Sequence, residues 1–336
     1  MGKRGQVYNK IYTPELFEQV NAVNVDILND YMIELKSNKK KETTIKQYYN
    51  DLRIVLIYIL KELNNKSILD LNKKQFRNMM LWMIEKEMSN ARCNRIMSAT
   101  RSMLDFCEND DDYEYDINYA KKVKGLEKER VRETVFLTDE QIEHLRNKLK
   151  EMGKYKYMLL VDLSYDSAGR RNEVSQIMKD GLLNRNYTNI VVGKRGKKFP
   201  LIYHDRTKES LKLYLDQRGE DDIPELWIIG EDNEDKNNRR PASYENLYDW
   251  MIYIANVLSE LEGTTINLTN HSFRHCAVEN LKNGSFYMCK KLGRTEGFSL
   301  DEIAVVCHHE SVEVTKSYAK NDDNDVLESM FGIKFE

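Results

Sequence analysis

The chain has 336 residues, of which 41% are hydrophobic, and this excludes a disordered polymer and leaves enough apolar side chains for two separate cores. Its formal net charge of -3 excludes a uniformly basic nucleic-acid binder, so any contact with phosphate must come from local clusters of Lys and Arg. Only 4 Pro and 15 Gly interrupt segments rich in Lys, Glu, Leu and Met, so we expect a mainly helical, α+β protein in which strand is the minority.

The first part of the chain is predicted to be helical. Apolar residues recur at spacings of three and four after Thr43 or Thr44, either of which could begin the first long helix. A Ser or Asn cap precedes the last helix of this part. The three predicted helices cover residues 43–63, 72–87 and 89–107, within an N-terminal domain at 1–122.

Two basic groups in this domain could contact DNA phosphates. One is the segment "SNKKKETTIK", and the other is a set of arginines at intervals of three and six along the last helix. Solvated basic faces without a ligand are the alternative for both groups. The residues concerned are Lys39, Lys40, Lys41, Thr43, Lys46, Arg92, Arg95 and Arg101.

A charged segment at 123–134 is the predicted linker to a second domain at 135–336. Helical structure is expected to resume at a capping box formed by Thr138 and Gln141. The stretch "YTNIVVGKRGKKFPLIYHD" then predicts a small antiparallel β-hairpin whose turn spans residues 193–196. Helix and loop are expected after it. The basic residues of the hairpin that could contact DNA are Lys197 and Lys198.

Four of the six histidines, at 271, 275, 308 and 309, lie in two short segments near the C-terminus. His271 and His275 could share a helix face and bind a metal with Cys307 and His308, but adjacent ligands converge poorly, so we expect no metal. The alternative is an anion site. His271 and Arg274 are one helical turn apart, and Glu173 follows Arg170 by three residues and can orient its guanidinium.

These segments occur in the order typical of the tyrosine recombinases, or phage integrase family, which the chain resembles over most of its length. "SAGRRNEV" is similar to T-G-x-R-x-x-E-L and matches its arginine with Arg170 and its glutamate with Glu173. "HSFRH" resembles H-x-L-R-H through His271 and Arg274. "HESVEVTKSY" resembles H-x-x-x-x-T-x-x-Y through His309 and Tyr318, and Lys194 matches the hairpin lysine.

The resemblance implies a helical core-binding domain and a mostly helical catalytic domain that cleave and rejoin duplex DNA. Tyr318 would attack the phosphodiester and form a 3′-phosphotyrosine, without a metal or other cofactor. Arg170 and Arg274 would bind the non-bridging oxygens, while Glu173 orients an arginine. His309 would donate a hydrogen bond, His271 would accept the tyrosine proton, and Lys194 would protonate the leaving 5′-oxygen.

The resemblance also implies a homotetramer on two DNA sites, assembled through the C-terminal tail. The apolar residues of this tail are Val326, Leu327, Met330 and Phe331, and packing within the same chain is the alternative for them. The helical pattern begins close to residue 1, so no separate arm-binding domain is expected.

A non-catalytic, sequence-specific DNA-binding protein on the same fold, such as a phage-type repressor, is the second functional hypothesis. Three departures from the family pattern favour it. The interval between Arg274 and His309 is longer than usual, and His308 stands where the family has glycine. The first box also carries Arg171 beside Arg170, which allows a register shift of one residue, although the R-x-x-E spacing favours Arg170.

Cysteine usage and hydropathy indicate the compartment. The five cysteines form no C-x-x-C pair, no secretory signal pattern is present, and no apolar run reaches the roughly 18 residues of a membrane span. We therefore expect a cytoplasmic protein with no membrane partner.

Overall fold

A computed structural model describes residues 11–127, 134–230, 238–294, 296–309, 311–316 and 318, apart from the side chain of Asn270. The chain divides into two compact units, Met1–Glu133 and Thr134–Glu336, each with its own hydrophobic core. The boundary falls in the interval 123–134, where the sequence predicts a linker, and residues 128–133 of that interval are outside the description. The two units are therefore considered one at a time.

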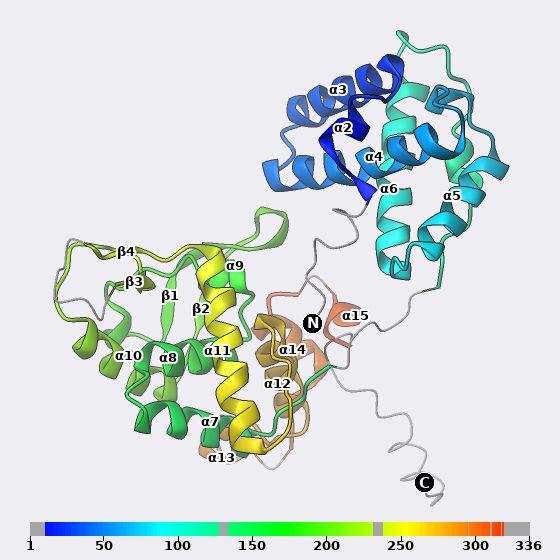
Figure 1. The fold of residues 1–336 in the computed structure, drawn as a ribbon. Helices are drawn as coiled ribbons and strands as arrows, with labels where there is room; N and C mark the ends of the chain where they lie inside the picture. Colours follow the sequence, from blue (N-terminus) through cyan, green and yellow to red (C-terminus); the bar gives the residue numbers. More distant parts are fainter. Residues whose placement is uncertain are drawn as a thin grey trace, which may run out of the picture. The chain divides into compact units, whose positions relative to one another are not determined.

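The first unit is a helical cluster built around one buried helix (Figure 1). Its α-helices are α2 (Pro14–Phe17), α3 (Ala22–Ser37), α4 (Glu42–Glu62), α5 (Lys73–Glu85) and α6 (Asn90–Glu108), and its 3₁₀ turns are η1 (Ile68–Asp70) and η2 (Tyr119–Lys122). Helix α4 contacts α2, α3 and α6. Its central residues 54–59 are buried on every side, so this stretch is apolar throughout and lacks the stripe of a surface helix.

Local signals in the sequence place the ends of these helices well. Ser89 caps α6 as predicted, with its hydroxyl accepting from the Arg92 amide at 3.4 Å. Helix α5 begins after Asn72, which forms a capping box with Gln75. Helix α4 begins at Glu42, before the predicted Thr43, because its N-cap is Lys41, whose side chain makes no capping hydrogen bond and gives no signal in the sequence.

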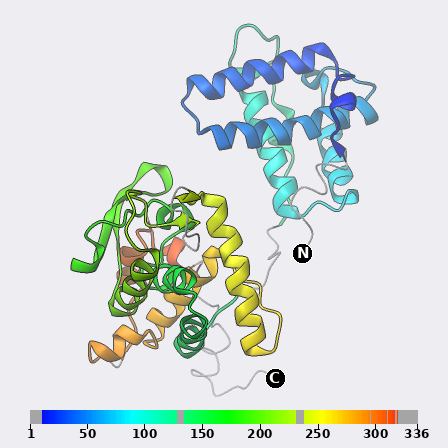
Figure 2. The same ribbon diagram turned by 60° about the vertical axis from the view of Figure 1, so that its left-hand side comes forward.

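The second unit consists of helices around the central helix α8, with small antiparallel strand pairs (Figures 1 and 2). Its helices are α7 (Asp139–Glu151), α8 (Tyr155–Asp166), α9 (Arg171–Val174), α10 (Asp205–Arg218), α11 (Tyr244–Glu262), α12 (Asn270–Lys282), α13 (Tyr287–Lys291), α14 (Leu300–Val306) and α15 (Val312–Lys316). Its 3₁₀ turns are η3 (Leu182–Asn184) and η4 (Lys194–Gly196), and its strands are β1 (Tyr187–Val192), β2 (Lys198–Ile202), β3 (Ile228–Ile229) and β4 (Arg240–Pro241).

Helix α8 positions the loop that follows it. It contacts α7, α10 and α12, and its residues 158–166 are all buried. Its polar residues are held by partners: Arg146 binds Asp162 at 3.0 Å, and Asp166 accepts from the Thr207 hydroxyl at 2.7 Å. The loop at 167–170 therefore leaves a rigid support.

The predicted hairpin is present, with Val191 opposite Phe199 and Val192 opposite Lys198, and a turn at residues 193–196. The prediction that only helix and loop follow it is wrong, since β3 and β4 form a second antiparallel pair. Each of these strands has two residues, too short for the alternation by which a strand is recognised.

The long interval between Arg274 and His309 contains α13 and α14. Helix α13 is fixed on the protein by Tyr287, whose hydroxyl donates to Asp166 at 2.9 Å and whose ring lies 3.8 Å from the Arg206 guanidinium carbon. Helix α14 contacts α12 and α15 (Figure 1). The extra residues are thus folded onto the unit.

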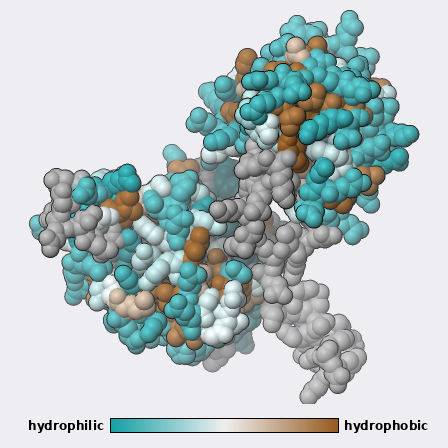
Figure 3. All heavy atoms as spheres, viewed as in Figure 1, coloured by the Kyte–Doolittle hydropathy of each residue, from teal (hydrophilic) through white to brown (hydrophobic). Residues whose placement is uncertain are grey.

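Hydrophilic residues cover most of the visible face of each unit, and hydrophobic ones are interspersed among them (Figure 3). None of the described helices is both long and apolar enough to cross a membrane. All five cysteines are buried and free.

Candidate active site

Arg170 follows α8 and is oriented by Glu173 on the next helix, α9. The Glu173 carboxylate accepts from the Arg170 backbone amide at 2.8 Å and from its Nη1 at 3.0 Å. Burial by itself lowers the pKa of Arg170, but hydrogen bonding and attraction to Glu173, and attraction to Tyr318, outweigh it, so the pKa is raised. The guanidinium is therefore held charged and close to Tyr318.

The neighbouring Arg171 points elsewhere. Its guanidinium carbon lies 3.6 Å from the ring centroid of Tyr244 and 5.3 Å from that of Tyr248, both on α11. Of the two adjacent arginines, Arg170 is thus the one that the structure places with the other predicted site residues.

Arg274, on α12, is 1% exposed and donates to backbone carbonyls on two sides. Its Nη1 donates to the Ala168 carbonyl, and its Nη2 donates to the Cys307 carbonyl at 2.6 Å. Its buried Nε has no hydrogen-bond partner among the described residues. Ala168 has a φ of 46°, in the left-handed region that glycine adopts most easily, so this carbonyl is presented at a conformational cost.

His309 links Arg274 to α15. Its Nε2 lies 2.5 Å from Arg274 Nη2 and its Nδ1 lies 2.8 Å from the Thr315 hydroxyl. A guanidinium can only donate, so Nε2 accepts and the proton of the neutral ring is on Nδ1, where it is donated to Thr315. Burial, followed by the charges of Arg274 and Arg170, lowers the pKa of His309 to about 3. The ring is therefore neutral at physiological pH.

Tyr318 lies among these groups. Its ring is stacked on His309 at a centroid distance of 5.1 Å and lies 5.1 Å from the Arg274 guanidinium carbon. Its backbone carbonyl is 2.9 Å from His275 Nδ1, which must be protonated to donate to it. The ring of His275 is 4.7 Å from that of Tyr318, and the ring of His271 is 6.5 Å away.

His271 is exposed on the first turn of α12. Its pKa is lowered, first by loss of water around the ring and then by the charge of Arg274, with smaller contributions from His275 and Arg170. The ring is therefore neutral at physiological pH and can accept a proton.

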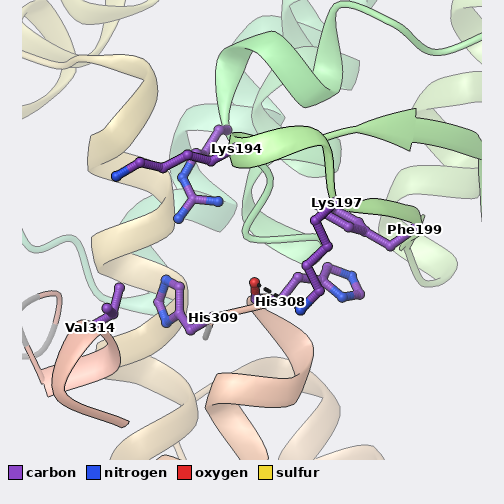
Figure 4. Close-up of a pocket in the computed structure, with 7 residues that line it drawn as sticks. Lys194, Lys197, Phe199, His308, His309 and Val314 are labelled. Carbon is purple, nitrogen blue, oxygen red and sulfur yellow. Dashed lines mark hydrogen bonds between the residues drawn. The ribbon is translucent and has the colours of Figure 1, made fainter. Parts of the chain in front are cut away.

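Lys194 lies exposed in the hairpin turn, at the edge of a pocket (Figure 4). This pocket is lined by Arg170, Lys194, Lys197, Phe199, His308, His309 and Val314. The structure thus brings three predicted residues, Arg170, Lys194 and His309, around one open space, while Arg274 and Tyr318 contact His309 on its other sides.

Three of the four residues that we considered as metal ligands, His275, Cys307 and His308, have other contacts. The His308 ring stacks on Phe199 at a centroid distance of 3.9 Å, and Cys307 presents its carbonyl to Arg274. His275 binds the Tyr318 carbonyl. No three His, Cys, Asp or Glu side chains in the described part of the chain are arranged to hold a metal ion.

The candidate DNA-contacting residues differ in availability. Arg92 is half-buried, Arg95 binds Asp51 at 2.8 Å, and Arg101 donates to the Ala120 and Val123 carbonyls, at 3.1 and 2.9 Å. Arg101 is thus engaged by its own unit. The others are exposed: Lys39, Lys40, Lys41, Thr43, Lys46, Lys197 and Lys198. The tail residues Val326, Leu327, Met330 and Phe331 lie outside the described residues.

Several residues that shape this site were not singled out from the sequence. Thr315 fixes the tautomer of His309, and Phe199 supports His308. Gly193 allows the hairpin to approach closely, since a Cβ there would lie 2.7 Å from the Phe199 ring. Thr315 stands three residues before Tyr318, as the threonine does in the T-x-x-Y end of the family pattern, a signal that could have identified it.

This helical unit, with its tyrosine, arginines and histidines, has the arrangement of a DNA strand-transfer enzyme of the tyrosine recombinase class. The sequence profile of the phage integrase family matches residues 135–325, which is more than half of the chain, so the protein belongs to that family. It is a tyrosine-type site-specific recombinase by family and by fold.

Known relatives extend the likeness to nearly the full chain. The SPbeta prophage-derived recombinase-like protein YomM of Bacillus subtilis (strain 168) is 24% identical over 336 residues, covering 95% of this chain and 94% of YomM. A lambda integrase (75-356) dimer bound to a COC' core site matches with a TM-score of 0.63 and 14% identity, over 86% of this chain and 96% of that one. A Tn1549 transposon integrase in complex with transposon right end DNA matches with a TM-score of 0.65 and 14% identity, over 91% and 98%.

Proposed function

We propose that Tyr318 is the nucleophile with which this recombinase cuts a DNA strand. Its oxygen would attack the scissile phosphorus while the bond from phosphorus to the 5′-oxygen breaks, leaving a 3′-phosphotyrosine and a free 5′-hydroxyl. The observation that carries the proposal is the position of Tyr318 against Arg274 and His309, with Arg170 close enough to interact with it. Rejoining is the same step in reverse, so no external energy source is needed.

Arg170 and Arg274 supply the positive charge that the transition state requires. Their guanidinium groups can bind the non-bridging oxygens on which negative charge accumulates. The unpartnered Nε of Arg274 supports this role, because a buried donor without an acceptor is costly and a phosphate oxygen would satisfy it. Glu173 would keep Arg170 charged and oriented.

The histidines have distinct roles in this proposal. His271, neutral and exposed near the Tyr318 ring, would accept the proton of the tyrosine. His309 has its Nδ1 proton engaged by Thr315 and its Nε2 engaged by Arg274. To donate to phosphate through Nε2, it would have to gain a proton or exchange tautomer as Arg274 turns to the phosphate.

Lys194 would protonate the departing 5′-oxygen. Its place in an exposed turn at the edge of the pocket allows its ammonium group to reach a strand lying over Arg170 and His309. No cofactor takes part in the proposed reaction.

The proposed partner is duplex DNA, contacted by two sets of exposed basic residues. One set lies at the turn between α3 and α4 and in the first residues of α4, and the other is on the hairpin. They comprise Lys39, Lys40, Lys41, Thr43, Lys46, Lys197 and Lys198, with Arg92 and Arg95 as further candidates. The Tn1549 transposon integrase described above is in complex with transposon right end DNA, which supports the proposal. The N-terminal unit would be the core-binding domain and the C-terminal unit the catalytic domain.

The decisive experiment uses a nicked suicide substrate carrying the protein's own site. Wild-type protein should form a covalent adduct with the DNA, and Tyr318→Phe should bind the same DNA but form none. Wild-type protein that binds the verified site without forming any adduct would overturn the proposal. That result would also be the behaviour of a repressor, which needs no nucleophile.

Assembly as a tetramer on two DNA sites through the C-terminal tail is part of the proposal. A lambda integrase tetramer bound to a Holliday junction has the same fold, with a TM-score of 0.64 over 89% of this chain, which supports it. Deleting the residues after Asn324 should weaken pairing of two DNA sites more than binding to one. Equal losses in both assays, measured by native gel shift, would contradict a role of the tail in assembly.

A further inference from the structure

His308 is the residue that no step of the proposed reaction uses, although it lines the same pocket as Arg170 and Lys194. Its φ of 53° lies in the left-handed region, where a side chain is unfavourable and glycine is not. The backbone at this position would therefore be more stable with glycine, so any advantage of histidine must come from the contacts of its side chain.

The His308 ring contacts the β-hairpin. It stacks on Phe199 of β2, with 3.9 Å between ring centroids and 22° between the planes. The His308 carbonyl also accepts from Lys197 Nζ at 3.4 Å (Figure 4). These two contacts, the ring stack and the Lys197 hydrogen bond, join the segment between α14 and α15 to the hairpin.

Phe199 also packs against the turn that carries Lys194, so it connects His308 to that turn. A Cβ at Gly193 would lie 2.7 Å from the Phe199 ring and 3.1 Å from Glu173 Oε1, so the backbone just before Lys194 rests directly on both. Val192, just before the turn, is held by Gln176, which accepts from its amide at 2.9 Å. The Phe199 ring contacts both His308 and the position of Gly193.

We propose that His308 is a positioning residue that holds the hairpin, and with it Lys194, at the correct distance from the reacting phosphate. The inference rests on the proposed role of Lys194 as the acid. His308 is adjacent in sequence to His309, so the short segment that contacts Arg274 would also determine how far Lys194 lies from the reacting phosphate. The attacking and the leaving side of the reaction would thereby be kept in register.

The test compares two leaving groups. His308→Asn removes the ring but suits the left-handed backbone, since asparagine tolerates this conformation. On an ordinary phosphodiester, its cleavage rate should fall by about tenfold or more, a part of the roughly hundredfold or larger effect of a general acid. On a substrate with a 5′-bridging sulfur, which leaves as a thiolate without needing a proton, it should cleave at nearly the wild-type rate. His308→Phe, which keeps the stacked ring, should lose less.

A second measurement does not depend on activity. The Gly193 amide donates to the Lys197 carbonyl at 2.8 Å across the turn, and its hydrogen exchange should be faster in His308→Asn than in His308→Phe. Equal losses on both substrates, or unchanged exchange and unchanged cleavage, would overturn the positioning role.

The Lys194→Ala variant distinguishes the acid role of Lys194 from the positioning role of His308. If it loses activity only on the ordinary phosphodiester while His308→Asn does not, the positioning role alone is wrong. If Lys194→Ala loses activity equally on both substrates, the acid role of Lys194 is wrong, and the inference about His308 is overturned with it.

Discussion

At the scale of single residues, carboxylate and carbonyl oxygens fix the guanidinium groups of Arg170 and Arg274. Glu173 is 1% exposed and uses one oxygen for the Arg170 backbone and the other for its guanidinium. Arg274 relies instead on the Ala168 and Cys307 carbonyls. A guanidinium held in this way loses little further freedom when it binds phosphate.

Glu173→Gln tests this dependence. The amide offers one acceptor where two are needed, and its NH₂ group would face a donor of Arg170. We expect adduct formation to slow by about tenfold to a hundredfold, the equivalent of roughly 1.5 to 3 kcal/mol for a hydrogen bond to a charged group. Rates from single-turnover cleavage of the suicide substrate give the measurement.

Binding to the same DNA provides the contrast. Losing a negative charge does not weaken attraction to phosphate, so the affinity of Glu173→Gln for an uncleaved site should be equal to or higher than that of the wild type. Glu260→Gln, an exposed change on α11, is the matched control and should alter neither quantity. A weaker affinity together with an unchanged rate would contradict the orienting role of Glu173.

At the scale of elements, the sequence is informative where a structure is decided locally. The capping boxes at Thr138 and Asn72 and the turn at residues 193–196 involve neighbours in the chain and are recognisable from it. The contacts of Arg274 with Ala168 and Cys307 join segments 106 and 33 residues apart, and no local pattern predicts them. The family motifs pointed to Arg274, His309 and Tyr318 as candidate site residues. Which atoms contact one another around Tyr318 is known only from the fold.

The hairpin illustrates the same distinction. Its turn was expected because Gly, Lys and Arg separate two β-rich runs, but the reason for Gly193 is tertiary. Gly193 has a φ of -83°, which any residue adopts, so it is the approach of Phe199 that excludes a side chain. Gly196, by contrast, has a φ of 79° and nothing within 4 Å of a Cβ.

Gly193→Ala should therefore destabilise the second unit by about 1 to 3 kcal/mol through overpacking against Phe199. It should also slow cleavage, because the displaced turn carries Lys194. Gly196→Ala is the control, with a cost of about 1 kcal/mol from backbone strain alone. In a Trp82→Phe background, Trp227 and Trp250 report by fluorescence on the unfolding of this unit only. If the Gly193→Ala protein is as stable as the Gly196→Ala protein, the Phe199 ring can move away without cost, and the predicted overpacking is wrong.

At the scale of the whole molecule, four histidines with lowered pKa values are concentrated in the second unit: His271, His275, His308 and His309. Burial is the largest cause in each case, and the charges of Arg274 or Lys197 add to it. The first unit has none of the chain's histidines. Acid should accordingly weaken the second unit in a pH range where most carboxylates are still ionised.

The lowered pKa of His309 determines whether the stability of the second unit rises or falls with pH. Its pKa is about 3 in the folded protein and about 6.5 in an unfolded chain, so between these values the unfolded state binds a proton that the folded state does not. Stability is therefore fully present above about pH 6.5 and decreases as the pH falls below it, by up to roughly 1.4 kcal/mol per pH unit for this one group. The decline is measured in urea from pH 7 to 5 as a difference in unfolding free energy between the Trp82→Phe protein and the same protein carrying His309→Asn.

His309→Asn isolates the contribution of this residue. The variant should be less stable than the wild type at pH 7, because it loses the contacts of the His309 ring with Arg274 and Thr315. The difference in unfolding free energy should narrow as the pH falls to 5, because an asparagine amide does not titrate. Asp162 titrates in the opposite sense, because burial raises its pKa to about 7, but it is common to both proteins and cancels in the difference. A stability difference that stays constant from pH 7 to 5 would mean that His309 binds protons equally in the folded and unfolded states, and would contradict the lowered pKa of His309.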